Sequence, residues 1–280
     1  MAHDVFIDVP DLMARLGDAR VRIVDARNVP HGAPSDLPSG LTLYRNGHIP
    51  RAMYLDYAGE LADAATPYAA RVAPPDAFAA ALGAKGIGDD NIVVAYDDGT
   101  IPFAARIVWM LHYYGHEEAY VLAGGLPAWL AAGGGLATDV PQFGHASFTA
   151  RPREKARATR DEVLAVAEGR SDAQLLETQR DATYAQRDLD IKGSVRLSGS
   201  QLLEDTRGGR VAPPETLARL VDDRRLDRTR RTIVSCGSGV AAAGSYFALK
   251  AAGFEDVAVY DGSWMEWEHD QLPTVRKPPS

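Results

Sequence analysis

The sequence predicts an α/β protein made of two tandem copies of one domain, each with a mostly parallel central sheet flanked by helices. Its 280 residues are enough for two domains of ordinary size. The two halves repeat one another, and in both of them short apolar runs alternate with helical stretches. Because the apolar runs are continuous rather than alternating, we expect parallel strands that are buried on both faces.

The internal repeat is the strongest of these observations. Residues 115–129 align with residues 253–267 without a gap, and a glycine opens and a tryptophan closes each segment. Weaker matches upstream join 21–27 to 173–179, 48–53 to 190–195, and 92–96 to 232–235. A repeat of this length indicates a duplicated domain rather than a solenoid.

We expect the first domain over residues 1–140, a linker over 141–155 and the second domain over 156–280. Prolines, a glycine and mixed charges replace the periodic apolar residues in the linker. The expected strands are the short apolar runs, at 23–25, 92–96, 120–122, 175–177, 232–235 and 257–260. The expected helices are the longer stretches between them, at 78–85, 103–114, 160–168, 214–221 and 241–252.

Composition excludes several classes of function. Thirty basic against 38 acidic side chains leave a net charge of −8, which argues against nucleic-acid binding and against adsorption to an anionic membrane. The uncharged stretch 119–138 contains five glycines and a proline, too broken for a membrane helix. The start of the chain lacks the pattern of a secretory peptide, so we expect a soluble, cytoplasmic protein with no membrane partner.

The chain has one cysteine, which excludes an intrachain disulfide and a multi-cysteine metal site; no metal is predicted. Cys236 ends an apolar run and is followed by Gly237, Gly239 and an alanine-rich stretch, so a strand, a loop and a helix are expected in turn. Ligands of parallel sheets bind at this end of a strand. We expect the loop amides and the helix N-terminus to lower the pKa of the thiol and to hold an anionic sulfur species such as a persulfide.

An inert, buried cysteine is the alternative interpretation. The first half provides an internal comparison, because Asp97 stands where the second half has its thiol. An aspartate would be a poor replacement for a packing residue. We therefore expect the second domain to be catalytic and the first, which has no cysteine, to be its non-catalytic partner.

These motifs resemble those of the rhodanese sulfurtransferases, and the resemblance covers nearly the whole chain. The segments that carry it are Gly47-His-Ile-Pro50, Tyr96-Asp-Asp-Gly99, Gly124-Gly-Leu-Pro-Ala-Trp129, Cys236-Gly-Ser-Gly-Val240 and Tyr260-Asp-Gly-Ser-Trp264. A loop reading Gly-Ser-Gly-Val is similar to that of the family's 3-mercaptopyruvate enzymes, whereas thiosulfate enzymes carry basic residues there. The resemblance implies two tandem rhodanese-like domains and sulfur transfer without a cofactor.

The resemblance also implies a reaction and a set of site residues. A sulfane sulfur would pass from a small donor, with 3-mercaptopyruvate favoured over thiosulfate, through a Cys236 persulfide to cyanide or to a thiol acceptor such as thioredoxin or a small thiol. Ser238 and His48 would assist catalysis. Their alternative roles are a turn hydroxyl for Ser238 and a domain-interface hydrogen bond for His48. The substrate-binding residues would be Gly237, Ser238, Gly239, Val240, Ala241 and Arg180.

Two departures from the family leave the donor open. The arginines that bind the donor's carboxylate in mercaptopyruvate enzymes are replaced by Gln179 and Thr183. Arg180 and Arg187 are nearby and would supply the charge after a local shift, unless they are solvated surface residues. The alternative function is a sulfur carrier or binding module that has the persulfide cradle but no efficient donor turnover.

A phosphatase is a further alternative on this fold. Such an enzyme needs an arginine six positions after the cysteine to neutralise phosphate, and this chain has Ala242 there. The phosphate charge would stay uncompensated, so we do not expect phosphatase activity.

Overall fold

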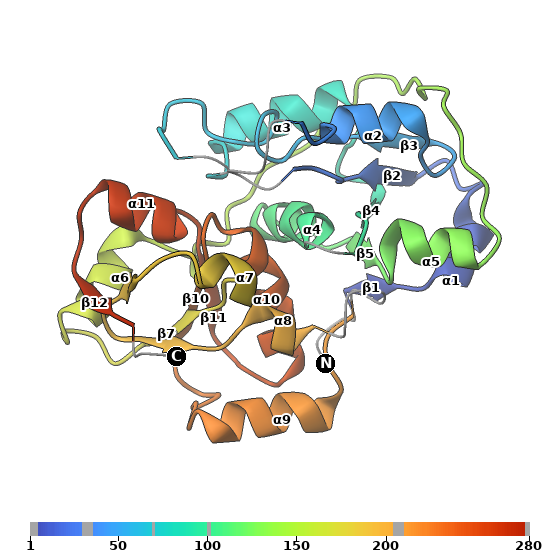
Figure 1. Cartoon of the computed structure of the whole chain (residues 1–280). Helices are drawn as coiled ribbons and strands as arrows, with labels where there is room; N and C mark the ends of the chain where they lie inside the picture. Colours follow the sequence, from blue (N-terminus) through green and yellow to red (C-terminus); the bar gives the residue numbers. More distant parts are fainter. Residues whose placement is uncertain (1–4, 30–35, 69–70, 100–101, 204–209, 278–280) are drawn as a thin grey trace. The chain divides into compact units, whose positions relative to one another are not determined.

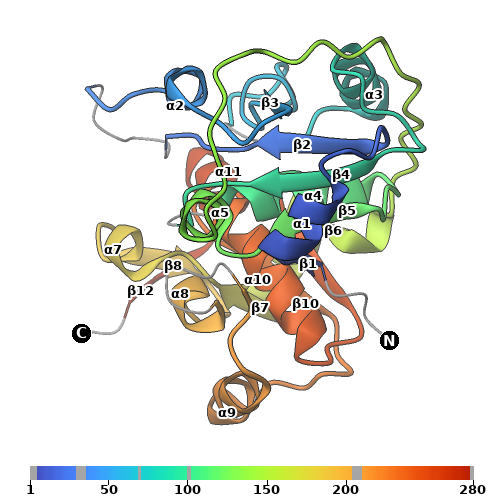
Figure 2. The same ribbon diagram turned by 90° about the vertical axis from the view of Figure 1, so that its right-hand side faces the viewer.

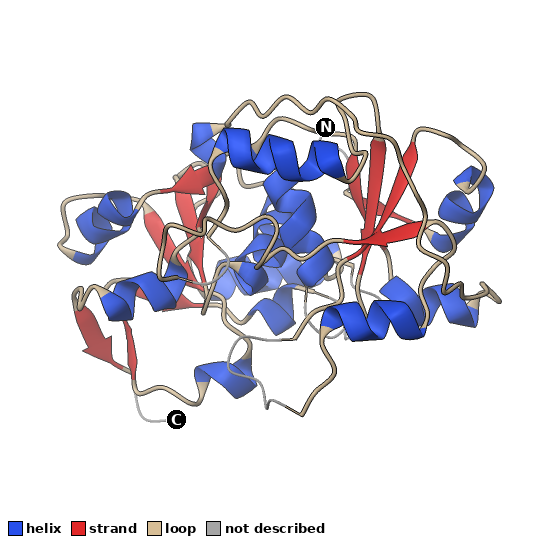
Figure 3. Cartoon of the chain, turned by 90° about the horizontal axis from the view of Figure 1, so that it is seen from above, coloured by secondary structure: helices blue, strands red, loops and turns tan. Residues whose placement is uncertain are grey.

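The computed structural model confirms the predicted fold class, with two compact α/β units that divide between Arg153 and Glu154 (Figure 1). It describes residues 5–29, 36–68, 71–99, 102–203 and 210–277. In Figure 3 the strands of each unit are gathered together and helices surround them.

The first unit is built on a five-stranded parallel sheet in the order β1-β5-β4-β2-β3 (Figure 2). Its strands are β1 (Phe6–Ile7), β2 (Val21–Asp25), β3 (Ala52–Tyr54), β4 (Ile92–Tyr96) and β5 (Ala119–Leu122). Its helices are α1 (Val9–Arg15), α2 (Gly40–Asn46), α3 (Pro75–Ala84), α4 (Phe103–Tyr113) and α5 (Gly125–Ala131). Residues of α1 and α5 join one apolar cluster with alternate residues of the central strands, so these two helices cover one face of the sheet.

The second unit repeats this sheet in the order β6-β11-β10-β7-β9, again with all strands parallel. Its strands are β6 (Arg157–Ala158), β7 (Gln174–Glu177), β9 (Ser194–Arg196), β10 (Thr232–Ser235) and β11 (Val257–Tyr260). A separate antiparallel pair joins β8 (Leu189–Ile191) to β12 (Thr274–Arg276). Each strand of the first sheet thus has a counterpart in the second.

The helices of the second unit follow the same plan. They are a 3₁₀ turn (Glu154–Ala156), α6 (Arg160–Ala167), α7 (Asp181–Tyr184), α8 (Gly199–Leu202), α9 (Pro214–Asp223), α10 (Val240–Ala251) and α11 (Ser263–His269). Residues of α6 and α11 share one apolar cluster with the central strands, as those of α1 and α5 do in the first unit. None of the helices in the described part of the chain is long and apolar enough to cross a membrane.

The repeat found in the sequence has matching local geometry in both units. Gly115 and Gly253 follow α4 and α10 and have φ angles of 86° and 88°, a left-handed conformation that glycine adopts without steric cost. The indole N–H groups of Trp129 and Trp267 each donate to a backbone carbonyl six residues further on, at 2.9 Å. These tryptophans are buried core residues in both copies.

The segment expected to link the domains is attached to the first unit over most of its length. The N–H of Ala146 donates to the carbonyl of Gly83, and that of Arg151 donates to the carbonyl of Tyr114. Prolines and glycines made this segment look like a free linker, but its backbone finds partners along α3 and after α4. The boundary between the units therefore lies near the end of the expected linker.

Candidate functional site

Cys236 directly follows β10, and its side chain is 2% exposed. Its sulfur accepts a hydrogen bond from the N–H of Gly239 at 3.1 Å. Its own N–H donates to Oγ of Ser263 (3.2 Å), and its carbonyl accepts from the N–H of Trp264 (3.0 Å). The first residues of α11, which follows the neighbouring strand β11, therefore fix the backbone of Cys236 through these two hydrogen bonds.

The loop has the strand–loop–helix form that the sequence predicts. Gly239 has a φ of 80° and is the N-cap residue of α10, a left-handed position that favours glycine. The backbone amides that bond the sulfur are those of Ser238, Gly239 and Ala242. Ala242 lies one residue beyond the predicted set, since the first turn of α10 aims its free N–H groups at the sulfur. Gly237 has no side chain, which lets Gln179 pack closely against the loop. A Cβ at position 237 would lie 3.2 Å from Nε2 of Gln179.

The expected lowering of the thiol pKa is wrong. Burial raises the pKa of Cys236 above its ordinary value, and the carboxylate of Glu177 raises it further. Hydrogen bonds from the loop amides act in the opposite direction without overcoming burial. The sequence shows the donors of the loop, but it shows neither the depth of the sulfur nor the carboxylate beside it.

Ser263 is a site residue that the sequence did not single out. It is fully buried, with Oγ accepting from the N–H of Cys236 and donating to the carbonyl of Tyr260 at 2.8 Å. Its φ of 51° is left-handed, and the aligned residue of the first unit, Gly125, has a φ of 54°. The available signal was this alignment, in which a serine stands where the other copy has a glycine.

In the first unit, Asp97 occupies the place of the cysteine. Its carboxylate accepts hydrogen bonds from the N–H groups of Gly99 (2.8 Å) and Ala104 (2.9 Å). The N–H of Leu126 donates to the carbonyl of Asp97, as that of Trp264 does to Cys236. Burial raises the pKa of Asp97 to about 6. The loop amides of the first unit are thus satisfied by a carboxylate of the chain itself.

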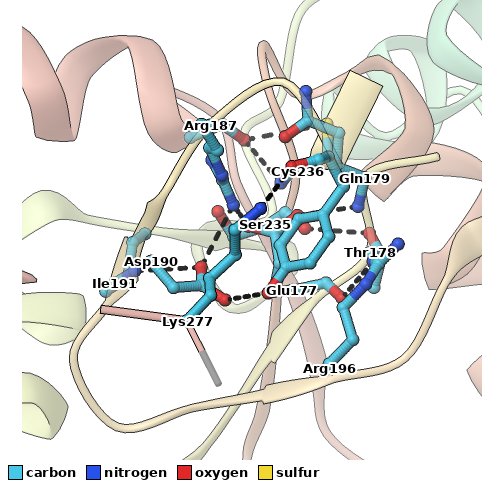
Figure 4. Close-up of polar contacts among 12 residues, drawn as sticks. Glu177, Thr178, Gln179, Arg187, Asp190, Ile191, Arg196, Ser235, Cys236 and Lys277 are labelled. Carbon is cyan, nitrogen blue, oxygen red and sulfur yellow. Dashed lines mark hydrogen bonds and ion pairs between the residues drawn. The ribbon is translucent and has the colours of Figure 1, made fainter. Parts of the chain in front are cut away.

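A buried ionic cluster adjoins the cysteine loop (Figure 4). Glu177 ends β7 directly opposite Ser235 of β10 and is fully buried. Nη2 of Arg187 lies 2.6 Å from Oε2 of Glu177 and 3.1 Å from Oδ1 of Asp190. Burial raises the pKa of Glu177, whereas the charge of Arg187 lowers it.

Arg180, the one cation among the predicted substrate-binding residues, follows this strand, as do Gln179 and Thr183, which stand at the two positions of the family's arginines. Gln179 is half-buried against Gly237, and the exposed Thr183 donates its hydroxyl to the carbonyl of Arg180. Arg180 is half-buried as the N-cap residue of α7. Its guanidinium makes no hydrogen bond or ion pair within the described residues. Arg180 is thus a cation directly after Gln179 in the chain, with no ion-pair partner among the described residues.

The other two predicted catalytic residues differ in their surroundings. His48 is fully buried, with Nδ1 at 2.8 Å from the carbonyl oxygen of Tyr44 and Nε2 at 3.0 Å from that of Asp139. Both ring nitrogens are therefore occupied within the first unit, which favours a structural role; its catalytic role stays a prediction. Ser238 is half-buried, and its hydroxyl has no bonding partner among the described residues, which leaves it available to a substrate.

Comparison with known proteins places the chain among sulfurtransferases. A family model described as a rhodanese-like domain matches residues 8–132 and 159–270. The chain is similar to bovine thiosulfate sulfurtransferase (31% identity over 241 residues, 82% of this chain and 80% of the relative). It is also similar to 3-mercaptopyruvate sulfurtransferase of Escherichia coli K12 (29% over 277 residues, 95% and 96%). The crystal structure of E. coli SseA, described as a 3-mercaptopyruvate sulfotransferase, superimposes with a TM-score of 0.83 at 27% identity, covering 93% of this chain and 99% of that one.

The Ser263 geometry predicts a stability effect. Ser263→Ala should lower the free energy of unfolding by about 1–2 kcal/mol, because the buried N–H of Cys236 loses its acceptor. Ser263→Gly loses the same hydroxyl but relieves the left-handed backbone, so it should be about 0.5–1 kcal/mol more stable than the alanine variant. Urea unfolding measures both, and equal stability of Ser263→Ala and the unmodified protein would contradict the assignment.

The raised pKa of Asp97 predicts a pH effect of defined sign. Since the folded pKa is about 6 against an ordinary 3.8, the folded protein binds the extra proton, and its free energy of unfolding falls as the pH rises through this window. The loss is about 3 kcal/mol at most. In urea unfolding measured from pH 4 to pH 6, Asp97→Asn should lack this pH-dependent fall in the free energy of unfolding. Asp76→Asn, at an exposed position on α3, should retain the fall.

Proposed function

This chain belongs to the rhodanese family and is a sulfurtransferase, and we propose that it moves a sulfane sulfur from a small donor to an acceptor through a persulfide on Cys236. The observation that carries the proposal is the position of the thiol at the end of β10, with backbone N–H groups aimed at its sulfur. Persulfide chemistry needs a nucleophilic sulfur and hydrogen-bond donors that stabilise the anionic persulfide. Cys236 would supply the sulfur, and the backbone N–H groups of its loop would supply the hydrogen bonds. Cys236 is the one cysteine of the chain, so no other thiol competes for the role.

The first half-reaction forms the persulfide. The thiolate of Cys236 attacks the sulfur of 3-mercaptopyruvate, the carbon–sulfur bond of the donor breaks, and the resulting enolate takes up a proton to become pyruvate. The raised pKa of the thiol means that its proton must leave as the donor binds. The amides of Ser238, Gly239 and Ala242 bond the sulfur and would hold it in its negative form, and we propose that the hydroxyl of Ser238, which has no partner among the described residues, passes a proton.

The second half-reaction returns the enzyme to its starting state. An external thiol, such as thioredoxin or a small thiol, attacks the outer sulfur and leaves as a persulfide, or cyanide attacks it and leaves as thiocyanate. The Cys236 thiol is regenerated in both cases. Because the chain has no second cysteine, the acceptor must come from outside it.

We favour 3-mercaptopyruvate over thiosulfate as the donor. Relatives named for both donors match at similar identity, so the choice depends on the loop. Residues 237–242 carry no charged side chain, which suits a donor that needs charge only at its carboxylate, away from the reacting sulfur. Arg180, which follows Gln179 and whose guanidinium has no partner among the described residues, is the substrate-binding cation that we propose. Gln179 and Thr183 leave no other charge at the two family positions.

The persulfide itself can be measured. After exposure to 3-mercaptopyruvate, the mass of the intact protein should rise by about 32 Da, the mass of one sulfur atom, and a thiol reductant should reverse the change. Cys236→Ser should show no increase. If neither 3-mercaptopyruvate nor thiosulfate modifies Cys236 and an added persulfide does, the chain acts as a sulfur carrier without donor turnover.

The role of Arg180 is tested by steady-state kinetics. Arg180→Ala should raise the KM for 3-mercaptopyruvate about tenfold or more with a much smaller change in kcat, because a charge-assisted contact to the carboxylate is lost in both ground and transition states. Arg219→Ala, at an exposed position on α9, is the matched control and should leave the KM unchanged. An unaltered KM in Arg180→Ala would remove this residue from the donor site.

A further inference from the structure

We infer that Arg187 is a positioning residue for the sulfur-transfer reaction: by neutralising Glu177 beside the cysteine loop, it sets the pH at which Cys236 becomes a thiolate. This role belongs to the nucleophile itself and is independent of which donor or acceptor the enzyme uses. It rests on the proposed function only in that Cys236 is the reacting group.

The position of Glu177 brings a carboxylate close to the nucleophile. Glu177 is paired in register with Ser235, the residue directly before Cys236, and both strands end there. Glu177 is fully buried, so water does not screen its charge. An ionised carboxylate at this place opposes ionisation of the neighbouring thiol. The site works at moderate pH only if this charge is compensated.

The first unit shows how the same position is compensated when the sequence keeps the family pattern. Asp25, the counterpart of Glu177 at the end of β2, is paired with Arg27 two residues later, through Nε at 3.0 Å and Nη2 at 2.6 Å. In the second unit the residue two positions after Glu177 is Gln179, which has no charge. Arg187, ten positions after Glu177, provides the cation instead. The charge pair is therefore conserved between the two copies although its sequence pattern is not.

Arg27 and Arg187 differ in their hydrogen bonds, and the difference favours an electrostatic role for Arg187. Arg27 also donates to the carbonyls of Leu43 and Gly47, so it joins the backbone of its unit together. Arg187 donates only through Nη2, to Glu177 and Asp190, and its buried Nε and Nη1 have no hydrogen-bond partner. Buried donors without partners cost stability and call for a functional explanation. Its guanidinium carbon lies 4.2 Å from the ring centre of Trp264, whose N–H holds the carbonyl of Cys236.

The remaining charges around the loop do not replace Arg187. On the side of β7, Asp190 shares Nη2 of Arg187 with Glu177 and adds a second negative charge. On the side of β11, Asp261 is paired with Arg157 at 3.3 Å, and Glu266 is buried on α11. On the side of β9, Arg196 donates to the carbonyl of Glu177 at 3.0 Å, but its Nη2 is paired with Asp181. Asp190 also accepts from the hydroxyl of Tyr184 at 2.7 Å. Among the described residues, Arg187 is thus the cation that contacts both buried carboxylates, and its removal takes that ion pair from both.

Alkylation of Cys236 by iodoacetamide tests the role without a sulfur donor. The thiolate is the reacting form and the chain has no other cysteine, so the pH dependence of the rate reports its ionisation. Arg187→Gln should move the midpoint about one pH unit higher, and Glu177→Gln should move it about one unit lower. The double variant should return close to the midpoint of the unmodified protein, and Arg187→Lys should keep it.

Two further comparisons make the test decisive. If Arg187→Gln fails to fold because Glu177 is left unpaired, the arginine is removed in the Glu177→Gln background, where the midpoint should still rise. Arg231→Gln is the matched control: Arg231 also binds two carboxylates, Glu162 and Asp256, but at the opposite end of β10, and the midpoint should not move. An unchanged midpoint on loss of Arg187, or a shift of both single variants in the same direction, would overturn the inference. Failure of donor turnover would leave these alkylation results intact.

Discussion

The site depends on two backbone hydrogen bonds that tie the cysteine loop to the start of α11. The N–H groups of Trp264 and Met265 donate to the carbonyls of Cys236 and Gly237, each at 3.0 Å. They fix one side of the loop, and on its other side the N–H groups of Ser238, Gly239 and Ala242 bond the sulfur. The first unit makes the equivalent bond between Leu126 and Asp97. The duplicated fold therefore makes the same amide cradle twice, whichever residue occupies it.

The occupant decides the chemistry of each cradle. In the first unit the carboxylate of Asp97 accepts two N–H bonds, so these donors are already taken by a negative charge of the chain. In the second unit the sulfur of Cys236 occupies the cradle and accepts from the loop amides, and in the proposed reaction it gains a second sulfur atom there. Burial acts on both groups in the same direction and raises both pKa values. Burial thus opposes the charged form of the group in each loop, whereas the N–H groups of the loop favour it.

The pair of Glu177 and Arg187 illustrates how a structural feature persists after its sequence motif is lost. The carboxylate at the end of the strand stays, but the cation now comes from the segment before β8 rather than from the residue two positions on. This segment also leads into the β8–β12 pair, whose pairing of Asp190 with Val275 has a shorter counterpart in the first unit, the antiparallel bridge between His48 and Ala137. The second unit has therefore rearranged the surroundings of its active thiol while keeping the charge balance there.

The sequence by itself determined the fold class, the duplication, the central strands and longer helices, and the placement of Cys236 after a strand. These follow from local patterns: apolar runs, glycine positions and a repeat. The edge strands β1, β3, β6 and β9 are two or three residues long and have no such pattern. Only the tertiary structure decided the depth of Cys236, the role of Ser263 and the partner of Glu177, because each depends on residues far apart in the chain. The raised thiol pKa follows from that packing, and no local pattern records it.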